Sequence, residues 1–395
     1  MSKYKVLWIS DLITPTGFSN VAHAIIANMP RERIQLVGLG VNYFGNPHKH
    51  DFPIYPAISG VGSRDVFGFE KLPYILGEEQ PDLIFILNDP WLVDNYLVTI
   101  KKYYGGMGKE VPKIIVYFPV DSEDHEPAWY TNFDVVSQAV IYTEFGKKVV
   151  KKAAPDLDTI IIPHGVDTDT FRKIFNTRKE AKENVFRNAP ALIDTFMILN
   201  ANRNQPRKRL DITLRAFKIF AEDKPDVRIY MHCGVKDAHI DVGTFATKLG
   251  IDTKLVLTNL SKGVQSIPQE SLNAIYNACD VGINTGVGEG WGLTSIEHAA
   301  TGAPQIIPNH SALGEIYKDC GLLVKTAMPF TLETTTTGYL VHEKEVAKAM
   351  NTLYSNRELY DDLSKKSTEK FTSSTYNWHE IARMWYNLFL DTIIK

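Results

Sequence analysis

Short apolar runs alternate with helix-forming segments along most of this 395-residue chain. In the first half, strand-length runs occur at 4–10, 35–41, 81–88, 113–120, 139–143 and 159–163, and helical spacing occurs at 19–28, 69–79, 91–104 and 144–153. In the second half, strands are predicted at 196–200, 227–233, 255–257, 280–284 and 305–308, separated by helices at 210–222, 242–249 and 271–278. This alternation predicts parallel, doubly wound α/β sheets.

The length of the chain exceeds what one ordinary hydrophobic core holds and suits two domains. The alternation of strands and helices breaks after Gly165, and charged residues dominate 165–190. We therefore predict Rossmann-like domains over 1–170 and 171–375. Helices are predicted at 343–355, 358–372 and 378–394, and the last of them has an apolar face for packing, made by Trp378, Trp385, Tyr386 and Phe389.

The composition favours a globular protein of a reducing compartment. Hydrophobic residues make up 44% and charged residues 23%, and the net charge of −3 gives no overall basic field for nucleic acid. The three cysteines are far apart in the sequence and predict buried thiols. The first apolar run, 6–9, is too short for a signal peptide, and no run has the length of a membrane span. We expect a cytoplasmic protein.

A glycine-rich segment at 286–304, GVGEGWGLTSIEHAATGAP, lies between two predicted strands and reads as a loop that enters a helix. Glycines at alternating positions let the backbone approach a ligand, and the N-terminus of the helix attracts an anion. Glu289 lies in the loop, and Glu297 lies about one and a half turns into the helix. Two acids beside a phosphate-binding loop indicate that the ligand is a sugar nucleotide. The alternative is a turn with two solvated glutamates.

The loop at 201–211, after the first strand of the second half, concentrates positive charge. Arg203 and Lys208 stand five residues apart, with Arg207 and Arg209 beside them, directly before a predicted helix. The alternative is a solvated helix start, but cations at a helix N-terminus oppose the helix dipole unless an anion compensates them. The loop therefore predicts a diphosphate site.

In the first half, Gly17, Asp89 and Asp121 each follow a predicted strand, where open α/β sheets place their ligands. The alternative for the two aspartates is loop capping. Acids and a histidine crowd 121–126, but their spacing is not that of a known zinc or calcium loop, so no metal is predicted.

The chain resembles the retaining family-4 glycosyltransferases, which have the GT-B fold. Glu289, seven intervening residues and Glu297 resemble the E-x7-E motif of that family, Arg203 and Lys208 resemble its diphosphate ligands, and 163–167, PHGVD, resembles its interdomain turn. The segment 310–315, HSALGE, matches a family turn loosely. Many members carry a histidine where this chain has Asp121, which puts the acceptor-side chemistry in doubt, although His125 is close by.

The resemblance implies two Rossmann-like domains facing a central cleft, with a C-terminal helix, 376–395, crossing back to the first domain. It implies transfer of a sugar from a nucleoside diphosphate with retention of configuration, by front-face attack, without metal or cofactor. Backbone groups of 257–264 would hold the base. The implied catalytic residues are Arg203, Lys208, Glu289 and Asp121. The implied donor contacts are Gly17, Arg203, Lys208, Gly290, Trp291, Gly292, Leu293, Thr294 and Glu297.

Three other classes were weighed. A nicotinamide dehydrogenase fails because Trp291 stands where its G-x-G-x-x-G fingerprint requires glycine. A sugar-nucleotide epimerase and a non-catalytic nucleotide- or glycan-binding protein of the same fold stay open. The favoured acceptor is a soluble glycan or small molecule. Nucleic acid is less favoured, and a lipid-linked acceptor with peripheral membrane contact would use the lysines of one helix, Lys147, Lys148, Lys151 and Lys152.

Overall fold

The computed structural model describes residues 3–58, 62, 64–263 and 267–395. The chain forms two compact units. The first comprises Met1–Val120, Asp124–His164 and Trp378–Lys395, and the second comprises Asp121–Glu123 and Gly165–Asn377. The division after His164 lies six residues before the boundary expected from the sequence, and a tripeptide from the first half of the chain belongs to the second unit.

The first unit is built on a parallel sheet with the strand order β3-β2-β1-β4-β5-β6-β7. Its strands are β1 (Tyr4–Ser10), β2 (Ile34–Gly40), β3 (Ile54–Pro56), β4 (Leu83–Leu87), β5 (Lys113–Tyr117), β6 (Gln138–Ile141) and β7 (Thr159–Ile161). Its helices include α1 (Gly17–Asn28), α2 (Leu72–Glu79), α3 (Pro90–Gly106) and α4 (Glu144–Ala153). Strand order reverses between β1 and β4, which is the arrangement of a doubly wound sheet.

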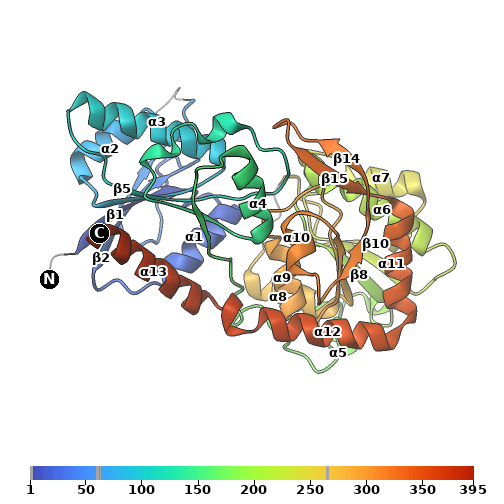
Figure 1. Cartoon of the computed structure of the whole chain (residues 1–395). Coiled ribbons are helices and arrows are strands. Elements are labelled where there is room, and N and C mark those ends of the chain that lie inside the picture. Colours follow the sequence, from blue (N-terminus) through green and yellow to red (C-terminus); the bar gives the residue numbers. More distant parts are fainter. Residues whose placement is uncertain (1–2, 59–61, 63, 264–266) are drawn as a thin grey trace. The chain divides into compact units, whose positions relative to one another are not determined.

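The last helix, α13 (Trp378–Ile394), packs on this first unit, as Figure 1 shows in dark red beside α1 and β1. Trp385 and Phe389 are fully buried, and their rings lie 5.1 Å and 5.2 Å from the ring of Phe85 in β4. The predicted return of the C-terminal helix to the first domain is therefore confirmed. Tyr386, expected on the packed face, is partly exposed because it lies one residue beyond Trp385 around the helix.

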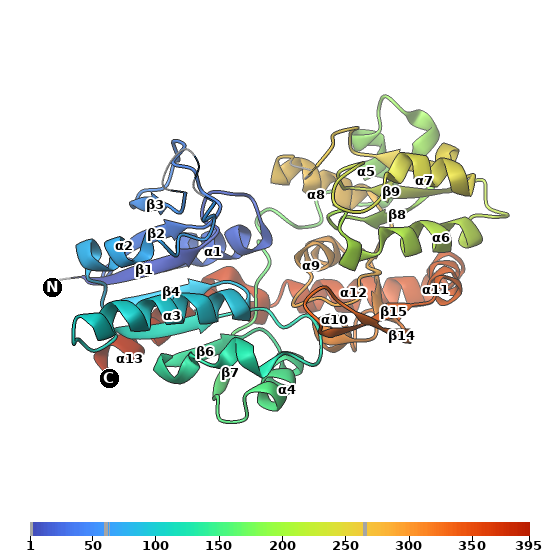
Figure 2. The same ribbon diagram turned by 90° about the horizontal axis from the view of Figure 1, so that it is seen from above.

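The second unit has a parallel sheet with the order β10-β9-β8-β11-β12-β13, the same winding as in the first unit. Its strands are β8 (Phe196–Asn200), β9 (Val227–Met231), β10 (Leu255–Leu257), β11 (Val281–Ile283), β12 (Gln305–Pro308) and β13 (Leu322–Val324). Its helices are α5 (Arg178–Val185), α6 (Leu210–Phe220), α7 (Val242–Leu249), α8 (Gln269–Ala278), α9 (Leu293–Ala300), α10 (Ser311–Ile316), α11 (Glu343–Ser355) and α12 (Arg357–Phe371) within the described residues. Figure 2 shows both sheets from above.

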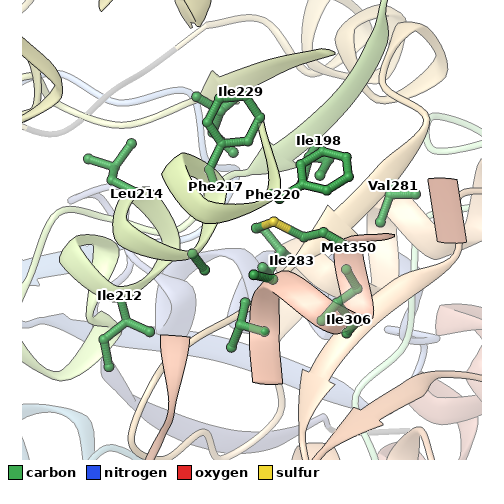
Figure 3. Close-up of a cluster of buried hydrophobic side chains, with 14 of the residues drawn as sticks. Ile198, Ile212, Leu214, Phe217, Phe220, Ile229, Val281, Ile283, Ile306 and Met350 are labelled. Atoms are coloured by element: carbon green, nitrogen blue, oxygen red, sulfur yellow. The ribbon is translucent and has the colours of Figure 1, made fainter. Parts of the chain in front are cut away.

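The core of the second unit lies between its sheet and the helices α6 and α11. Phe217 and Phe220 of α6 meet Met350 of α11 over the strand residues Ile198 and Ile283, as Figure 3 shows. These apolar positions recur at the spacing of one helix face, which explains why the sequence predicts α6 and α11 well.

An antiparallel hairpin, β14 (Thr326–Thr331) and β15 (Thr337–Val341), follows β13. The sequence predicts only a threonine-rich loop at 331–337. That expectation misses both strands, because β14 is largely exposed and lacks the alternation of buried and exposed residues that marks a half-buried strand.

The cysteines Cys233, Cys279 and Cys320 are buried and form no disulfide bond with one another, as predicted. Burial raises the pKa of Cys233 to about 12, which keeps this thiol protonated and unreactive at neutral pH. In the described part of the chain, every helix is too short or too polar to cross a bilayer.

Candidate active site

The turn between β8 and α6 is fixed from both sides. It contains a short 3₁₀ helix, η4 (Pro206–Lys208), and Arg209 follows with a left-handed φ of 50°. The side-chain amide of Asn204 donates to two backbone carbonyls, over 3.1 Å and 2.7 Å. Thr285, two residues after β11, donates to the carbonyl of Arg209 over 2.9 Å. The basic side chains of this turn therefore start from a rigid backbone.

Lys208 and Glu289 form a buried ion pair: their charged groups are in contact, and the two residues are 9% and 5% exposed. Arg207 extends the pair, because its Nη1 atom lies 3.7 Å from a carboxylate oxygen of Glu289 and 3.6 Å from one of Asp121. The same nitrogen donates to the carbonyl of Gly288 over 3.1 Å. We call Asp121, Arg207, Lys208 and Glu289 the cation–acid cluster.

The Lys208–Glu289 pair is ionised at neutral pH. Burial alone would raise the pKa of Glu289, but the charges of Lys208 and Arg207 hold that pKa below its ordinary value. Burial lowers the pKa of Lys208 to about 8; Arg207 adds to the effect and Glu289 opposes it. Lys208 is therefore the cation that first loses its charge as the pH rises.

The glycine-rich loop needs glycine for close approach at two positions. A Cβ atom on Gly288 would lie 2.0 Å from the carbonyl oxygen of Asp121, a contact that no side chain tolerates. Gly292 has a left-handed φ of 86°, and a Cβ atom there would lie 2.6 Å from the side chain of Leu313. These constraints bring the loop against Asp121 and start α9 directly at its end.

Glu297 lies in α9 and is held by Tyr276, whose hydroxyl donates to its carboxylate over 3.1 Å. Burial raises the pKa of Glu297 to about 8; the Tyr276 hydrogen bond opposes the shift and the charge of Asp167 adds to it. Glu297 is thus protonated at neutral pH before any ligand binds. A protonated carboxyl both donates and accepts hydrogen bonds, which suits a pair of hydroxyl groups.

The other predicted donor contacts of the second unit surround the start of α9. Trp291 is 4% exposed and its ring lies 6.0 Å from that of Tyr376, which indicates a packing role. The first N–H groups of any helix lack intrahelical acceptors, so the start of α9 offers backbone donors to an anion. Four residues there are partly exposed: Gly290, Gly292, Leu293 and Thr294.

Three further predicted residues lie outside the cation–acid cluster. Arg203 pairs with Asp237 over 2.7 Å, and its side chain is 45% exposed. Gly17 belongs to the first unit, where it begins α1 behind the capping side chain of Thr16. Asp89 stands at the N-cap position of α3 in the same unit. The structure thus gathers Lys208, Glu289 and Asp121 but gives Arg203 a separate acidic partner.

Arg207 is the residue that sequence reasoning missed as a site residue. The sequence shows it inside the run PRKR, next to Lys208, and nothing in that run separates a buried contact from a solvated charge. The placement of Arg207 depends on Asp121 and Gly288, which are distant in sequence. The sequence signals for this pairing are the basic run 206–209 and the single acid of the glycine loop, Glu289.

The tripeptide Asp121–Glu123 reaches the second unit by strand-like pairing. The backbones of Glu123 and Thr337 exchange two hydrogen bonds, of 2.8 Å and 3.0 Å. Ser122 donates to the hydroxyl of Thr336 over 2.9 Å, and Tyr339 donates to the Glu123 carboxylate over 3.2 Å. The hairpin therefore fixes Asp121 against the glycine loop.

The remaining predictions concern a metal ion, the segment that would hold the nucleotide base, and the lysines of α4. Among the described residues, histidine, cysteine, aspartate and glutamate form no grouping that suits a metal ion. The acids of 121–126 are divided between the two units. Of the segment expected to hold the base, 257–263 is described and Val264 lies outside the described residues. The lysines of α4 are exposed: Lys147, Lys148, Lys151 and Lys152.

Comparison with known proteins gives a family match to the part of the chain that carries Arg207, Lys208 and Glu289. Residues 182–370 match the family model for glycosyl transferases group 1. The chain is 22% identical to mannosylfructose-phosphate synthase from Agrobacterium fabrum over 230 residues, 56% of this chain and 45% of that protein. It is 28% identical to D-inositol 3-phosphate glycosyltransferase from Thermomonospora curvata over 157 residues, 39% of this chain and 36% of that protein. The matches span less than half of these curated relatives.

Solved structures define the fold. Sucrose-phosphate synthase from Thermosynechococcus elongatus superposes with a TM-score of 0.75 at 15% identity, covering 99% of this chain and 100% of that one. Anabaena Alr3699/HepE in complex with UDP and glucose superposes with a TM-score of 0.70 at 13% identity, covering 98% and 100%. With two Rossmann-like units and these neighbours, the chain has the GT-B fold, and residues 182–370 resemble the glycosyl transferases group 1 family.

Proposed function

We propose that this protein is a retaining glycosyltransferase that moves a sugar from a nucleoside diphosphate to an acceptor. The family model over the second unit supports glycosyl transfer. The curated relatives are named as a synthase and a glycosyltransferase, and a structural neighbour was solved with UDP-glucose. These names favour a nucleotide-sugar donor for this chain as well.

The observation that carries the proposal is the cation–acid cluster beside the start of α9. Lys208 and Arg207 place two positive charges against the glycine-rich loop, and α9 adds backbone N–H donors. A diphosphate takes up charge and hydrogen bonds of this kind. In the ligand-free protein the carboxylate of Glu289 neutralises these cations, a role that the diphosphate would share when it binds.

The same cations would drive the reaction. As the bond between the sugar and the diphosphate breaks, negative charge grows on the leaving phosphate, and fixed cations stabilise that charge more than the ground state. The acceptor hydroxyl would attack from the face that the diphosphate leaves, and its proton would pass to the departing phosphate oxygen. Arg203 would join Lys208 once the diphosphate competes with Asp237. Because the charges come from side chains, we propose that the enzyme needs no metal.

The two glutamates would recognise different halves of the donor. Glu297 would bind the ribose hydroxyls, and Glu289, held between Lys208 and Arg207, would bind the sugar. Asp121 would orient Arg207, which it approaches to 3.6 Å. A soluble glycan or small molecule is the proposed acceptor. A membrane-bound acceptor is the alternative that the exposed lysines of α4 would favour.

A donor screen tests the proposal without an acceptor. The full chain is incubated with a panel of nucleotide sugars, and slow hydrolysis and thermal stabilisation are measured. Binding of a donor raises the melting temperature and releases nucleoside diphosphate at a slow rate. If nucleotides stabilise the protein but neither transfer nor hydrolysis occurs with any donor, the protein is a binding protein and the enzymatic proposal fails.

Calorimetry with free nucleoside diphosphate then distinguishes the role of Glu297 from that of Glu289. Glu297→Ala should weaken nucleotide binding, whereas Glu289→Ala should leave it intact and impair the use of the donor sugar. Arg207→Ala and Arg203→Ala should each lower turnover by about 10²-fold, the scale of one lost charge contact in the transition state. Arg357→Ala is the matched control, because Arg357 also pairs with an acid but is 78% exposed on α12. Equal losses of nucleotide binding in the two glutamate variants would refute the division of roles.

A further inference from the structure

A group of aromatic side chains lies at the carboxyl ends of β4 and β5 in the first unit. Trp91 begins α3 after β4, and Trp129 lies in η1 (Pro127–Tyr130) after β5. β4 and β5 are neighbouring parallel strands, so both segments emerge at the same edge of the sheet. The two indole rings lie 5.0 Å apart at an angle of 59°, and both are partly exposed. We call Trp91 and Trp129 the tryptophan pair.

Buried contacts hold the tryptophan pair in place. His125 packs against Trp129 edge to face, at 4.9 Å, and its Nδ1 atom makes a 2.7 Å hydrogen bond with the hydroxyl of Tyr130. His125 and Tyr130 are each 7% exposed. Asp94 of α3 accepts two hydrogen bonds from Asn132, over 2.7 Å and 3.0 Å, and ties α3 to the segment after η1. The pair is therefore a rigid surface.

The loops around the tryptophan pair carry acids and lack fixed cations. The segments 11–17, 88–91 and 118–130 contain neither lysine nor arginine. Four acids lie at this edge in the first unit: Asp11, Asp89, Asp124 and Glu126. A phosphate placed among these carboxylates would be repelled by their charge.

The segment that carries Trp129 also carries Asp121, which belongs to the second unit. It begins at Asp121, which approaches Arg207 of the cation–acid cluster, and it continues to His125 and Trp129. In open α/β sheets, ligands bind outside the carboxyl ends of the strands, next to the point where strand order reverses. In this unit the reversal lies between β1 and β4, directly beside the segment that carries Trp91.

We propose that the tryptophan pair binds an uncharged sugar ring of the acceptor and that the acceptor is not phosphorylated at this ring. The C–H face of a sugar packs on indole rings, and its hydroxyl groups donate hydrogen bonds to the surrounding carboxylates. The relatives are named for phosphate-bearing compounds, so this chain would differ from them in acceptor charge. The inference rests on the proposed function, because it names the acceptor of that reaction.

The test compares neutral, anionic and cationic forms of the same sugar ring. Glucose, mannose and galactose, their 6-phosphates and their 2-amino derivatives are each offered to the full chain saturated with the nucleoside diphosphate found in the donor screen. Binding is followed by saturation-transfer NMR, and transfer by product formation. At least one neutral sugar should bind and accept transfer better than its 6-phosphate and its amino derivative. Tightest binding of a 6-phosphate, binding of amino sugars alone, or no binding of any neutral sugar would overturn the proposal.

Variants connect the binding to the tryptophan pair. Trp91→Ala should weaken neutral-sugar binding about tenfold, the effect of losing one stacked aromatic contact, and Trp91→Phe should restore most of it. Phe44→Ala is the matched control, since it removes another aromatic side chain of the first unit, 68% exposed, away from the pair in sequence. Nucleotide binding is measured in every sample. Unchanged sugar binding by Trp91→Ala would overturn this inference and leave the proposed function standing. Absence of nucleotide-sugar binding in the wild type would refute the proposed function itself.

Discussion

Lys208→Ala probes the cation–acid cluster through stability and turnover together. The substitution removes one member of a buried ion pair and leaves the carboxylate of Glu289 buried. Arg207 remains 3.7 Å from that carboxylate, where its gross attraction is about 4.5 kcal/mol at an effective dielectric constant of about 20. Breaking a buried pair costs about 3–5 kcal/mol. Because Arg207 compensates in part, we expect a loss of about 3 kcal/mol in the free energy of unfolding, at the low end of that range.

A double variant separates this stability effect from catalysis. Glu289→Gln in the Lys208→Ala background removes the uncompensated charge and should restore most of the lost stability. Turnover should fall by about 10²-fold in the single variant, because a charge that stabilises the leaving diphosphate is gone, and the double variant should not recover it. The exposed Lys365 gives the control, Lys365→Ala, which should match the wild type.

The assay is urea unfolding. The relevant transition is the one whose midpoint rises when free nucleoside diphosphate is added, because that transition reports unfolding of the unit that binds the nucleotide. Donor hydrolysis on the same samples gives turnover. A Lys208→Ala variant that unfolds at the wild-type urea concentration would refute the buried ion pair. A double variant no more stable than Lys208→Ala would show that the loss does not come from the charge of Glu289.

Three further outcomes follow from the charges of the chain. Since burial lowers the pKa of Lys208 to about 8, kcat/KM should decline above about pH 8 as the ammonium loses its proton, and Lys208→Arg should remove that decline. Activity should survive EDTA; abolition by the chelator and recovery with manganese or magnesium would contradict a metal-free mechanism. Sedimentation with anionic liposomes tests the exposed face of α4, where each lysine adds about 1 kcal/mol of binding free energy at an anionic surface. Absence of binding at low salt would remove the membrane alternative. Binding that is lost when four lysines are changed to glutamate would support it: Lys147, Lys148, Lys151 and Lys152.

The sequence predicts the repeating part of the fold because that part is encoded locally. The helix at 343–355 and the last helix, at 378–394, have the bounds expected from their apolar spacing. The helix expected at 69–79 begins instead at Leu72, with Pro73 in its first turn, where a proline is tolerated. Periodicity thus identifies an element reliably and its first turn less so.

Features made by distant residues escape prediction. Arg207 gains its position from a carboxylate 86 residues earlier in the chain and from Glu289 later in it. Asp121 joins the second unit because Glu123 pairs with Thr337, across more than two hundred residues. The exposed strand β14 has no burial pattern to reveal it. In each case the sequence supplies the residue type, while the partner is chosen by the folded chain.

The pairing of Asp121–Glu123 with the hairpin limits how this protein can be divided. A fragment that starts at Gly165 and ends at Asn377 would lack the tripeptide, although the second unit includes it. Such a fragment would expose the backbone groups of Thr337 and leave Gly288 without the carbonyl that covers it. Chimaeras that exchange halves with a relative would carry a mismatched tripeptide at this place. A chimaera therefore needs Asp121–Glu123 to come from the same protein as its second unit, although these residues lie within the sequence of the first unit.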